Sequence, residues 1–434
     1  MILEFVTLMQ IAAASPAPQV EPQDSIPQFT LAEALQAAAQ LDPNYVSALG
    51  AIQNARWVKR QALALFVVPS ISVSTSLTKA DAPLFNVGTG GLADQIVSAQ
   101  VDASYDLFRG GAKLYNLFRA RAELESANAN EISARFATAL LTESDFYDVL
   151  AEKELVRVST ERAERAEEQL AVARARVISG AAVRTDSLQL LLELTRARVD
   201  LLRQQAILKV AQVQLGRRVG AAGPVDAVLE RPITSPDLPI SEDSAVVEAL
   251  AQGPDYRKAI ADESAAEAAY KATYGAYLPQ ISLFASYQGF GEEYAPDAFT
   301  RTVWGFRVNL PLWNNAQREV ALTQARTSRD VARAVRRDAE LAIRRDAIEA
   351  YQAYNTARAS AELARQAVVV ARENLDVQQT RYRAGATTIL DLLSGQVSLS
   401  EAEAGLVQAV YATRLALAGL EAILGRRLFE DRGF

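Results

Sequence analysis

Two different periods of hydrophobic and polar residues follow one another along this chain, and each predicts one kind of element. Between Ala112 and Ser179, and again between Ala316 and Ala384, there is neither Gly nor Pro. In the first of these runs, apolar residues recur at intervals of three, four or seven among many alanines and charged residues. Such a narrow apolar seam is typical of coiled-coil helices, and at ~1.5 Å per residue the run would reach ~100 Å. The chain is therefore expected to be mainly α, with two very long helices.

A short turn and a return helix follow each long helix. The turns contain Gly180 and Gly385, 205 positions apart, and each glycine precedes an aspartate by six positions, Asp186 and Asp391. Glycine just past a helix C-terminus is typical of a left-handed residue that ends the helix. A return helix without Gly or Pro is expected over Asp186–Leu215. The pattern predicts two copies of one long helical hairpin.

Between the helical segments, the period changes from 3.6 to 2. Alternating runs of about ten residues occur at about residues 69–78, 96–108, 280–290 and 301–310. The apolar members that we expect to face lipid include Val73, Val101, Leu283 and Phe306. Ten residues is the length that a tilted strand needs to cross a bilayer. Alternation is a weak signal, so each hairpin taken alone favours the alternative of a solvated hairpin on a soluble core.

Helix, strand pair, long helix, turn and return helix occur twice in the same order. This duplication divides the chain into five parts. They are a signal-like segment with a Pro-rich tether (1–28), a first structural repeat (29–215), an equatorial linker (216–243), a second structural repeat (244–425) and a C-terminal tail (426–434).

The N-terminus partly fits a secretory signal. Ile2 to Ala14 is mostly apolar and ends in small residues, but Glu4 interrupts it and the first basic residue is Arg56. An atypical signal, a start that lies inside the true signal and a disordered apolar tail all remain open.

Composition narrows the function classes. The net charge of the 434 residues is −7, which disfavours nucleic acid as a partner. There is no cysteine and no histidine, so disulfides, thiolate metal sites and the commonest catalytic base are absent. We therefore expect no enzyme activity and no cofactor. No run of 18 apolar residues occurs, so no transmembrane helix is expected.

Four membrane-length strands cannot close into a barrel, and an open sheet edge is not tolerated in hydrocarbon. Several chains must then share one barrel. Three chains give twelve strands, whereas two give eight, whose interior would be nearly filled by side chains. With long helices continuing from the strands, three chains form a continuous tube, and the physical interpretation is a duct.

At this point the chain resembles the TolC-like outer-membrane efflux proteins, over roughly residues 29–428. The resemblance rests on the duplication and on the two glycine turns, of which Tyr382-Arg383-Ala384-Gly385 with Leu390-Asp391 is the more specific. It implies a homotrimer with a twelve-stranded β-barrel in the outer membrane of a Gram-negative bacterium. It also implies that this barrel continues into an α-helical tunnel through the periplasm.

The resemblance further implies the exit duct of a tripartite efflux or type I secretion system. Its partners would be a periplasmic membrane-fusion adaptor and an inner-membrane pump or secretion ATPase. Gly180 and Gly385 would mark the tips that meet the adaptor. The residues that would constrict the periplasmic aperture are Asp186, Tyr382 and Asp391. Some members carry an arginine and a second acid where this chain has Thr387 and Ser394, so the resemblance does not extend to a double acidic ring or its ion pair.

Two alternatives remain open at this stage. A soluble periplasmic coiled-coil scaffold or adaptor would also contain long helical hairpins. Asp186 and Asp391 would each also be explained by a helix start, where an acid is favourable to the helix dipole. No residue separates drug or metal-ion efflux from protein secretion.

Overall fold

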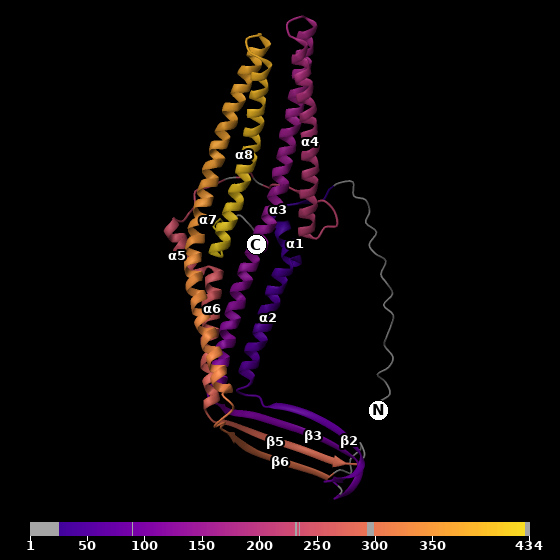
Figure 1. Ribbon diagram of the computed structural model, residues 1–434, viewed down its shortest axis with the longest axis vertical. Helices are drawn as coiled ribbons and strands as arrows, with labels where there is room; N and C mark the ends of the chain where they lie inside the picture. Colours follow the sequence, from indigo (N-terminus) through magenta and orange to yellow (C-terminus); the bar gives the residue numbers. More distant parts are fainter. Residues whose placement is uncertain (1–25, 89, 231, 234, 293–298, 430–434) are drawn as a thin grey trace.

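The molecule is a long rod of helices with a small β-sheet at one end (Figure 1). The computed structural model describes residues 26–429 except 89, 231, 234 and 293–298. The α-helices are α1 (Leu31–Leu41), α2 (Pro43–Ala64), α3 (Ala112–Ile178), α4 (Arg184–Val219), α5 (Glu242–Gln252), α6 (Pro254–Thr273), α7 (Gln317–Arg383) and α8 (Ile389–Leu424). The strands are β1 (Gln28–Phe29), β2 (Ser70–Asn86), β3 (Gly91–Arg109), β4 (Asp226–Ala227), β5 (Gln280–Gly291) and β6 (Phe299–Asn309).

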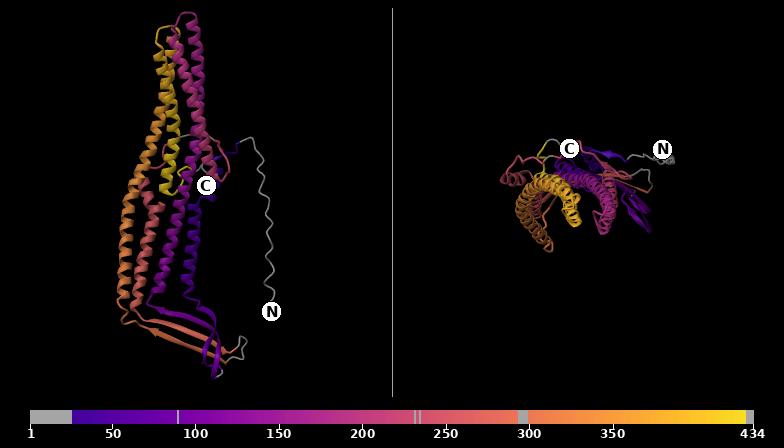
Figure 2. Two further views of the ribbon diagram at one scale, coloured as in Figure 1. Left: turned by 45° about the vertical axis from the view of Figure 1, so that its right-hand side comes forward. Right: turned by 90° about the horizontal axis from the view of Figure 1, so that it is seen from above.

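Two helices, α3 and α7, run nearly the whole length of the rod, and each has 67 residues. α2 and α6 pack along their sheet-end halves, and α4 and α8 along their other halves. Contacts of α3 with α6 and α8 join the two repeats. Seen along the rod, the helices form an arc (Figure 2). α8 is also long and apolar enough in composition to cross a membrane, but it packs along α7 and α3.

Local capping explains where the first helices begin. The Oγ1 of Thr30 accepts the N–H of Glu33 (3.3 Å), and Oε2 of Glu33 accepts the N–H of Thr30 (2.9 Å). This reciprocal pair is a capping box. Asp42 then caps α2 by accepting the N–H groups of Asn44 and Tyr45, and Pro43 occupies the first helical position, where no N–H is needed.

Near the end of each repeat, an arginine pairs with a carboxylate of α3. Arg218, near the end of α4, donates to Asp145 at 2.7 Å. Arg427, just past α8, pairs with the buried Glu143 (2.8 Å) and Glu421 (2.7 Å). These ion pairs hold the ends of the return helices at the middle of the rod.

The large sheet is antiparallel, with strand order β2-β3-β5-β6. The two hairpins pair through β3 and β5, so both repeats contribute to one sheet. β2 and β6 are its edge strands, and neither has a second partner among the described residues of this chain.

β2 and β3 are longer than the sequence alternation indicated. The expected strands at 69–78 and 96–108 are in fact residues 70–86 and 91–109. The alternation breaks near Lys79, but pairing resumes after a register shift between Lys79 and Leu84. A bulge of this kind interrupts the period of two without ending the strand, which is why the pattern placed the end too early.

Candidate functional site

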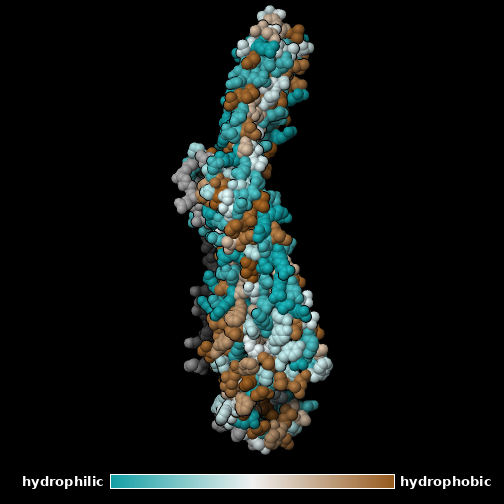
Figure 3. Space-filling view, turned by 90° about the vertical axis from the view of Figure 1, so that its left-hand side faces the viewer, coloured by the Kyte–Doolittle hydropathy of each residue, from teal (hydrophilic) through white to brown (hydrophobic). Residues whose placement is uncertain are grey.

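One face of the large sheet is apolar and exposed. Register pairs Val73 with Val101 and Leu283 with Phe306, and Tyr287 opposite Val101 lies on the same strand face as Leu283. All four residues expected to face lipid therefore share one face. Val73 is 76% exposed and Phe306 is 72% exposed. Figure 3 shows hydrophobic residues gathered around the sheet end, below a mainly hydrophilic shaft. Contact of this face with lipid stays a prediction.

The opposite face of the sheet is polar. Ser70 pairs with Ser104 through their hydroxyls at 2.7 Å, and Ser76 pairs with Ser98 in the same way at 2.8 Å. Further along this face, Arg301 donates to Gln288 at 2.6 Å. A sheet with one apolar and one mainly polar face fits the wall of a water-filled barrel.

The far end of the rod carries two tips, the first tip (residues 176–187) and the second tip (residues 381–392). In the first tip, the N–H of Gly180 donates to the carbonyl of Val177 (3.1 Å) and that of Ala181 to Arg176 (2.8 Å). The second tip repeats both bonds 205 positions later, at 3.0 and 2.8 Å. This is the Schellman arrangement, which needs a left-handed residue. Gly180 and Gly385 both have φ 74°, which confirms the predicted conformation.

Asp391 lies in the first turn of α8 and closes a capping box there. Its Oδ2 accepts the hydroxyls of Thr388 (2.7 Å) and Thr387 (2.8 Å) and the N–H of Thr388 (3.1 Å). Hydrogen bonds from Thr388 and Thr387 lower the pKa of the Asp391 carboxyl below its usual value. Asp391 therefore does help to start α8, as its position predicted. A place of Asp391 at the aperture stays a prediction.

Tyr382 belongs to the second tip and contacts the first tip. It is only 4% exposed, and its ring lies 4.7 Å from the guanidinium of Arg176 in the first tip. Nη1 of Arg176 also donates to the carbonyl of Tyr382. Burial and the nearby Asp186 carboxylate raise the pKa of the Tyr382 hydroxyl, although Arg176 acts in the opposite direction. The structure thus brings two of the three predicted aperture residues, Tyr382 and Asp186, into one neighbourhood.

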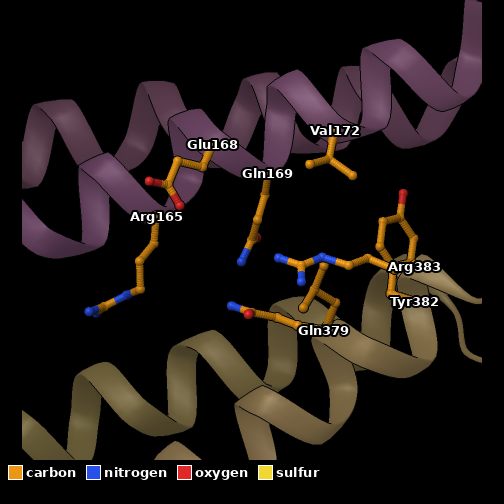
Figure 4. A pocket seen from close by; sticks show the side chains of 8 residues that line it. Arg165, Glu168, Gln169, Val172, Gln379, Tyr382 and Arg383 are labelled. Carbon is orange, nitrogen blue, oxygen red and sulfur yellow. The ribbon is translucent and has the colours of Figure 1, made fainter.

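Polar contacts continue along the seam between α3 and α8. Nη2 of Arg165 lies 3.3 Å from the largely buried Glu403, and Gln396 donates to Gln169. Next to them is a small cavity of about 50 Å³ between α3 and the α7–α8 hairpin, with Arg383, Gln169 and Gln379 pointing into it (Figure 4). The cavity is lined by Arg165, Glu168, Gln169, Val172, Gln379, Tyr382, Arg383 and Leu392. The two hairpins therefore meet through a polar seam.

Sequence reasoning did not identify Arg176, which links the two tips. Arg176 and Arg381 occupy equivalent positions of the repeat, in the last turn of the helix before the glycine. Nothing in the local pattern distinguishes them. Only the packing of one hairpin on the other selects Arg176 as the residue that crosses.

Known proteins share this sequence and this fold. A model of the family "outer membrane efflux protein" matches residues 245–426. The chain is 28% identical over 345 residues to the pyoverdine export outer membrane protein OpmQ of Pseudomonas aeruginosa, a match that covers 77% of this chain and 71% of that protein. It is 24% identical over 369 residues to the outer membrane efflux protein BepC of Brucella suis, covering 84% and 78%.

The same fold occurs in solved structures. The outer membrane protein VceC of Vibrio cholerae superposes with a TM-score of 0.75 at 18% identity, over 92% of this chain and 97% of that one. This likeness includes both repeats, whereas the family model matches the second. The duplicated hairpins, the two strand pairs and the sequence matches agree: the chain is similar in sequence and in fold to outer membrane efflux proteins.

Proposed function

We propose that this protein is the outer-membrane exit channel of a tripartite efflux or type I secretion system. Substrates would pass from a periplasmic adaptor and an inner-membrane transporter through its helical part and out through its barrel. The observation that carries the proposal is a sheet at one end of a rod of helices, with one exposed apolar face and with two edge strands that have no second partner in the described part of the chain. We also propose that the channel catalyses no reaction.

The free edges favour a closed ring of three chains. β2 and β6 each present unpaired N–H and C=O groups, which hydrocarbon does not tolerate, and pairing β2 of one chain with β6 of the next removes both edges. Head-to-tail contacts of this kind close into rings. Three copies of the four-stranded sheet give twelve strands, within the range of outer-membrane barrels.

The helices support the same ring. In the tip half, contacts run in the order α4-α3-α8-α7, so α4 and α7 are the outer helices of the arc. Both carry exposed apolar side chains. On α4 they include Leu188, Leu192, Val199, Leu202, Val210 and Val213. On the tip half of α7 they include Leu363, Val369, Val370 and Val377. Packing α4 of one chain against α7 of the next would cover both sets and form a tunnel.

The tips are the proposed periplasmic end. Gly180 and Gly385 would lie where adaptor hairpins dock, and three copies each of Asp186, Tyr382 and Asp391 would surround the closed aperture. Like charges ~6 Å apart repel by roughly 3 kcal/mol at an effective dielectric near 20. A bound cation or a wider aperture would relieve this repulsion.

The lipid-facing assignment is tested by a matched pair of substitutions. Val73 and Ser72 are neighbours on opposite faces of β2. An arginine near the bilayer midplane of a barrel costs ~2–4 kcal/mol per copy, and much less on the water-filled side. We expect Val73→Arg to reduce the amount of heat-resistant trimer in outer membranes, and Ser72→Arg to leave it near the wild-type amount. Equal amounts for both variants, or extraction of the wild type without detergent, would favour the soluble scaffold instead.

The aperture is tested by ion selectivity. The reversal potential of purified trimers in planar bilayers under a salt gradient reports the preference for cations. We expect Asp391→Asn and Asp186→Asn, singly and together, to weaken that preference because acids at the narrowest point attract cations. Unchanged selectivity in all three variants would place the constriction elsewhere.

A further inference from the structure

The two turns that lead from the sheet into the long helices are equivalents of the repeat, 205 positions apart. β3 leads through Gly110 and Gly111 into α3, and β6 leads through residues 310–316 into α7. In each case the second residue of the long helix is a cation, Lys113 in α3 and Arg318 in α7. We call these two residues the junction cations.

Lys113 reaches back from α3 to the sheet. Its Nζ donates to the carbonyl oxygen of Asp106 in β3 and to that of Leu65, just past α2, at 2.7 Å. The same ammonium lies 4.5 Å from the ring centroid of Tyr105, whose hydroxyl donates to the carbonyl of Phe66 at 2.6 Å. Burial lowers the pKa of Lys113, with the Asp106 carboxylate opposing this effect. One side chain therefore connects α3, β3 and the end of α2.

Arg318 makes the corresponding contacts in the second repeat. Nη1 donates to the carbonyl oxygen of Pro311 (2.8 Å) and Nη2 to that of Leu312 (3.1 Å). The guanidinium carbon lies 4.8 Å from the ring centroid of Tyr277, in the short turn between α6 and β5. Pro311 follows Asp106 by 205 positions, so both junction cations bind the same carbonyl of the repeat. Only 12% of the Arg318 side chain is exposed.

The two turns differ in backbone strain. Gly110 and Gly111 have φ 59° and 78°, a left-handed conformation that glycine adopts readily. Their equivalents, Asn315 and Ala316, have φ 55° and 60°. For alanine this conformation is strained because Cβ approaches the following carbonyl. The strained turn has the arginine, whose planar fork binds two adjacent carbonyls of the segment that leads into that turn, those of Pro311 and Leu312. The glycine turn has the lysine, whose ammonium binds one carbonyl of β3 and one just past α2.

We propose that Lys113 and Arg318 are positioning residues that set the bend between the sheet and the long helices, and that Arg318 also holds the left-handed turn at residues 315–316. Figure 1 shows this bend, where the strands leave the helix axis sharply. The inference rests on the proposed channel in one respect, since the bend would align the barrel with the tunnel. Distances within one protomer report the bend whether or not the trimer conducts.

The test is a distance measurement between spin labels in full-length trimers. The chain contains no cysteine, so two introduced cysteines are the only labelling sites. One pair is Leu92→Cys in β3 with Gln53→Cys in α2, and the other is Thr300→Cys in β6 with Asp255→Cys in α6. Labelled protomers are diluted with unlabelled ones to isolate distances within a chain. Conductance of the same trimers in planar bilayers reports the channel separately.

Methionine keeps the apolar stem of each junction cation but removes its donors. We expect Lys113→Met and Arg318→Met each to widen the distance distribution of its own repeat at least twofold, while Lys113→Arg and Arg318→Lys stay close to the wild type. The matched control is Arg119→Met, because Arg119 is an exposed cation of α3 that pairs with Glu123 one turn away on the same helix. Unchanged distributions in both methionine variants would overturn the proposal.

A second variant separates positioning from mere packing. Ala316→Gly relieves the left-handed strain without touching Arg318. Combined with Arg318→Met, it should narrow the spin-label distance distribution again. If Arg318→Met lowers the amount of trimer, the double variant should regain at least half of the loss. Ala316→Gly should not narrow the distance distribution of the Lys113→Met variant. If Arg318→Met yields no trimer, recovery by Ala316→Gly supports the assignment, and no recovery overturns it for the second repeat.

Discussion

The first and second tips have the same backbone but different surroundings. Both end a 67-residue helix with a left-handed glycine at φ 74° and the same pair of turn hydrogen bonds. The first tip is open: Ile178 is 88% exposed and Val183 is also exposed. In the second tip, Tyr382 and Ile389 are buried in the cluster where the two hairpins meet.

The helix starts after the glycines differ as well. Thr388 caps α8 and shares a capping box with Asp391. The equivalent position before α4 is Val183, whose side chain makes no capping hydrogen bond, although Asp186 is retained three residues later. Arg176 connects the first tip to the second. Equal spacing in two repeats therefore does not mean equal roles, and the second tip is the more firmly anchored one.

The largest effect is expected at the glycines that the tips share. A β-branched residue in the left-handed region is strained, so Gly180→Val and Gly385→Val should each cost about 2 kcal/mol per protomer. Cross-linking to the adaptor should fall while the barrel still forms. Ala384→Val is the control, since Ala384 has φ −77°. If cross-linking is undiminished with both glycines changed, the docking surface lies elsewhere.

The link between the tips should give the next largest effect. Arg176→Met removes a charged hydrogen bond and a cation–π contact, and we expect a loss of roughly 1.5 kcal/mol. The two tips of one protomer should move apart, measured by spin-label distances. Arg381→Met is the matched control because Arg381 is the equivalent residue in the second tip and its side chain is exposed. An equal change in both variants would contradict the difference between the tips.

Exchanging the capping residues should reverse the order of local stability. Thr388→Val should cost α8 about 1 kcal/mol, and Val183→Thr should stabilise α4 by up to a similar amount because Asp186 can complete the box. Amide hydrogen exchange in the first turns of α4 and α8 measures both changes. If Val183→Thr does not stabilise α4, the absent cap does not limit the stability of its first turn.

The smallest effect is a pH dependence confined to the second tip. The folded-state pKa of Asp391 is depressed because Thr388 and Thr387 donate hydrogen bonds to the carboxylate. Its stabilisation is thus fully present above the ordinary value of 3.8 and is lost as pH falls through the lower folded value. Protection of the first turn of α8 against amide exchange should decline as the pH falls below 3.8 and through the lower folded-state pKa of Asp391. Asp391→Asn should remove this dependence, and a decline that persists in that variant would assign it to other groups.

The sequence by itself determined the elements whose causes are local. Runs without Gly or Pro predicted helices over 112–179 and 316–384, and the structure has them at 112–178 and 317–383. The left-handed conformations of Gly180 and Gly385 followed from short-range geometry in the same way. A period of 2 likewise indicated which side chains of a strand share a face.

Only the tertiary structure decided which distant segments meet. The register of β3 with β5, the continuation of β2 past Lys79, and the choice of Arg176 rather than Arg381 depend on contacts between residues far apart in the chain. The burial of Tyr382 belongs to the same class. A residue's own neighbours set its backbone preference, but its partner across an interface is set by the packing of two whole hairpins. Two repeats with the same spacing can therefore reach different surroundings.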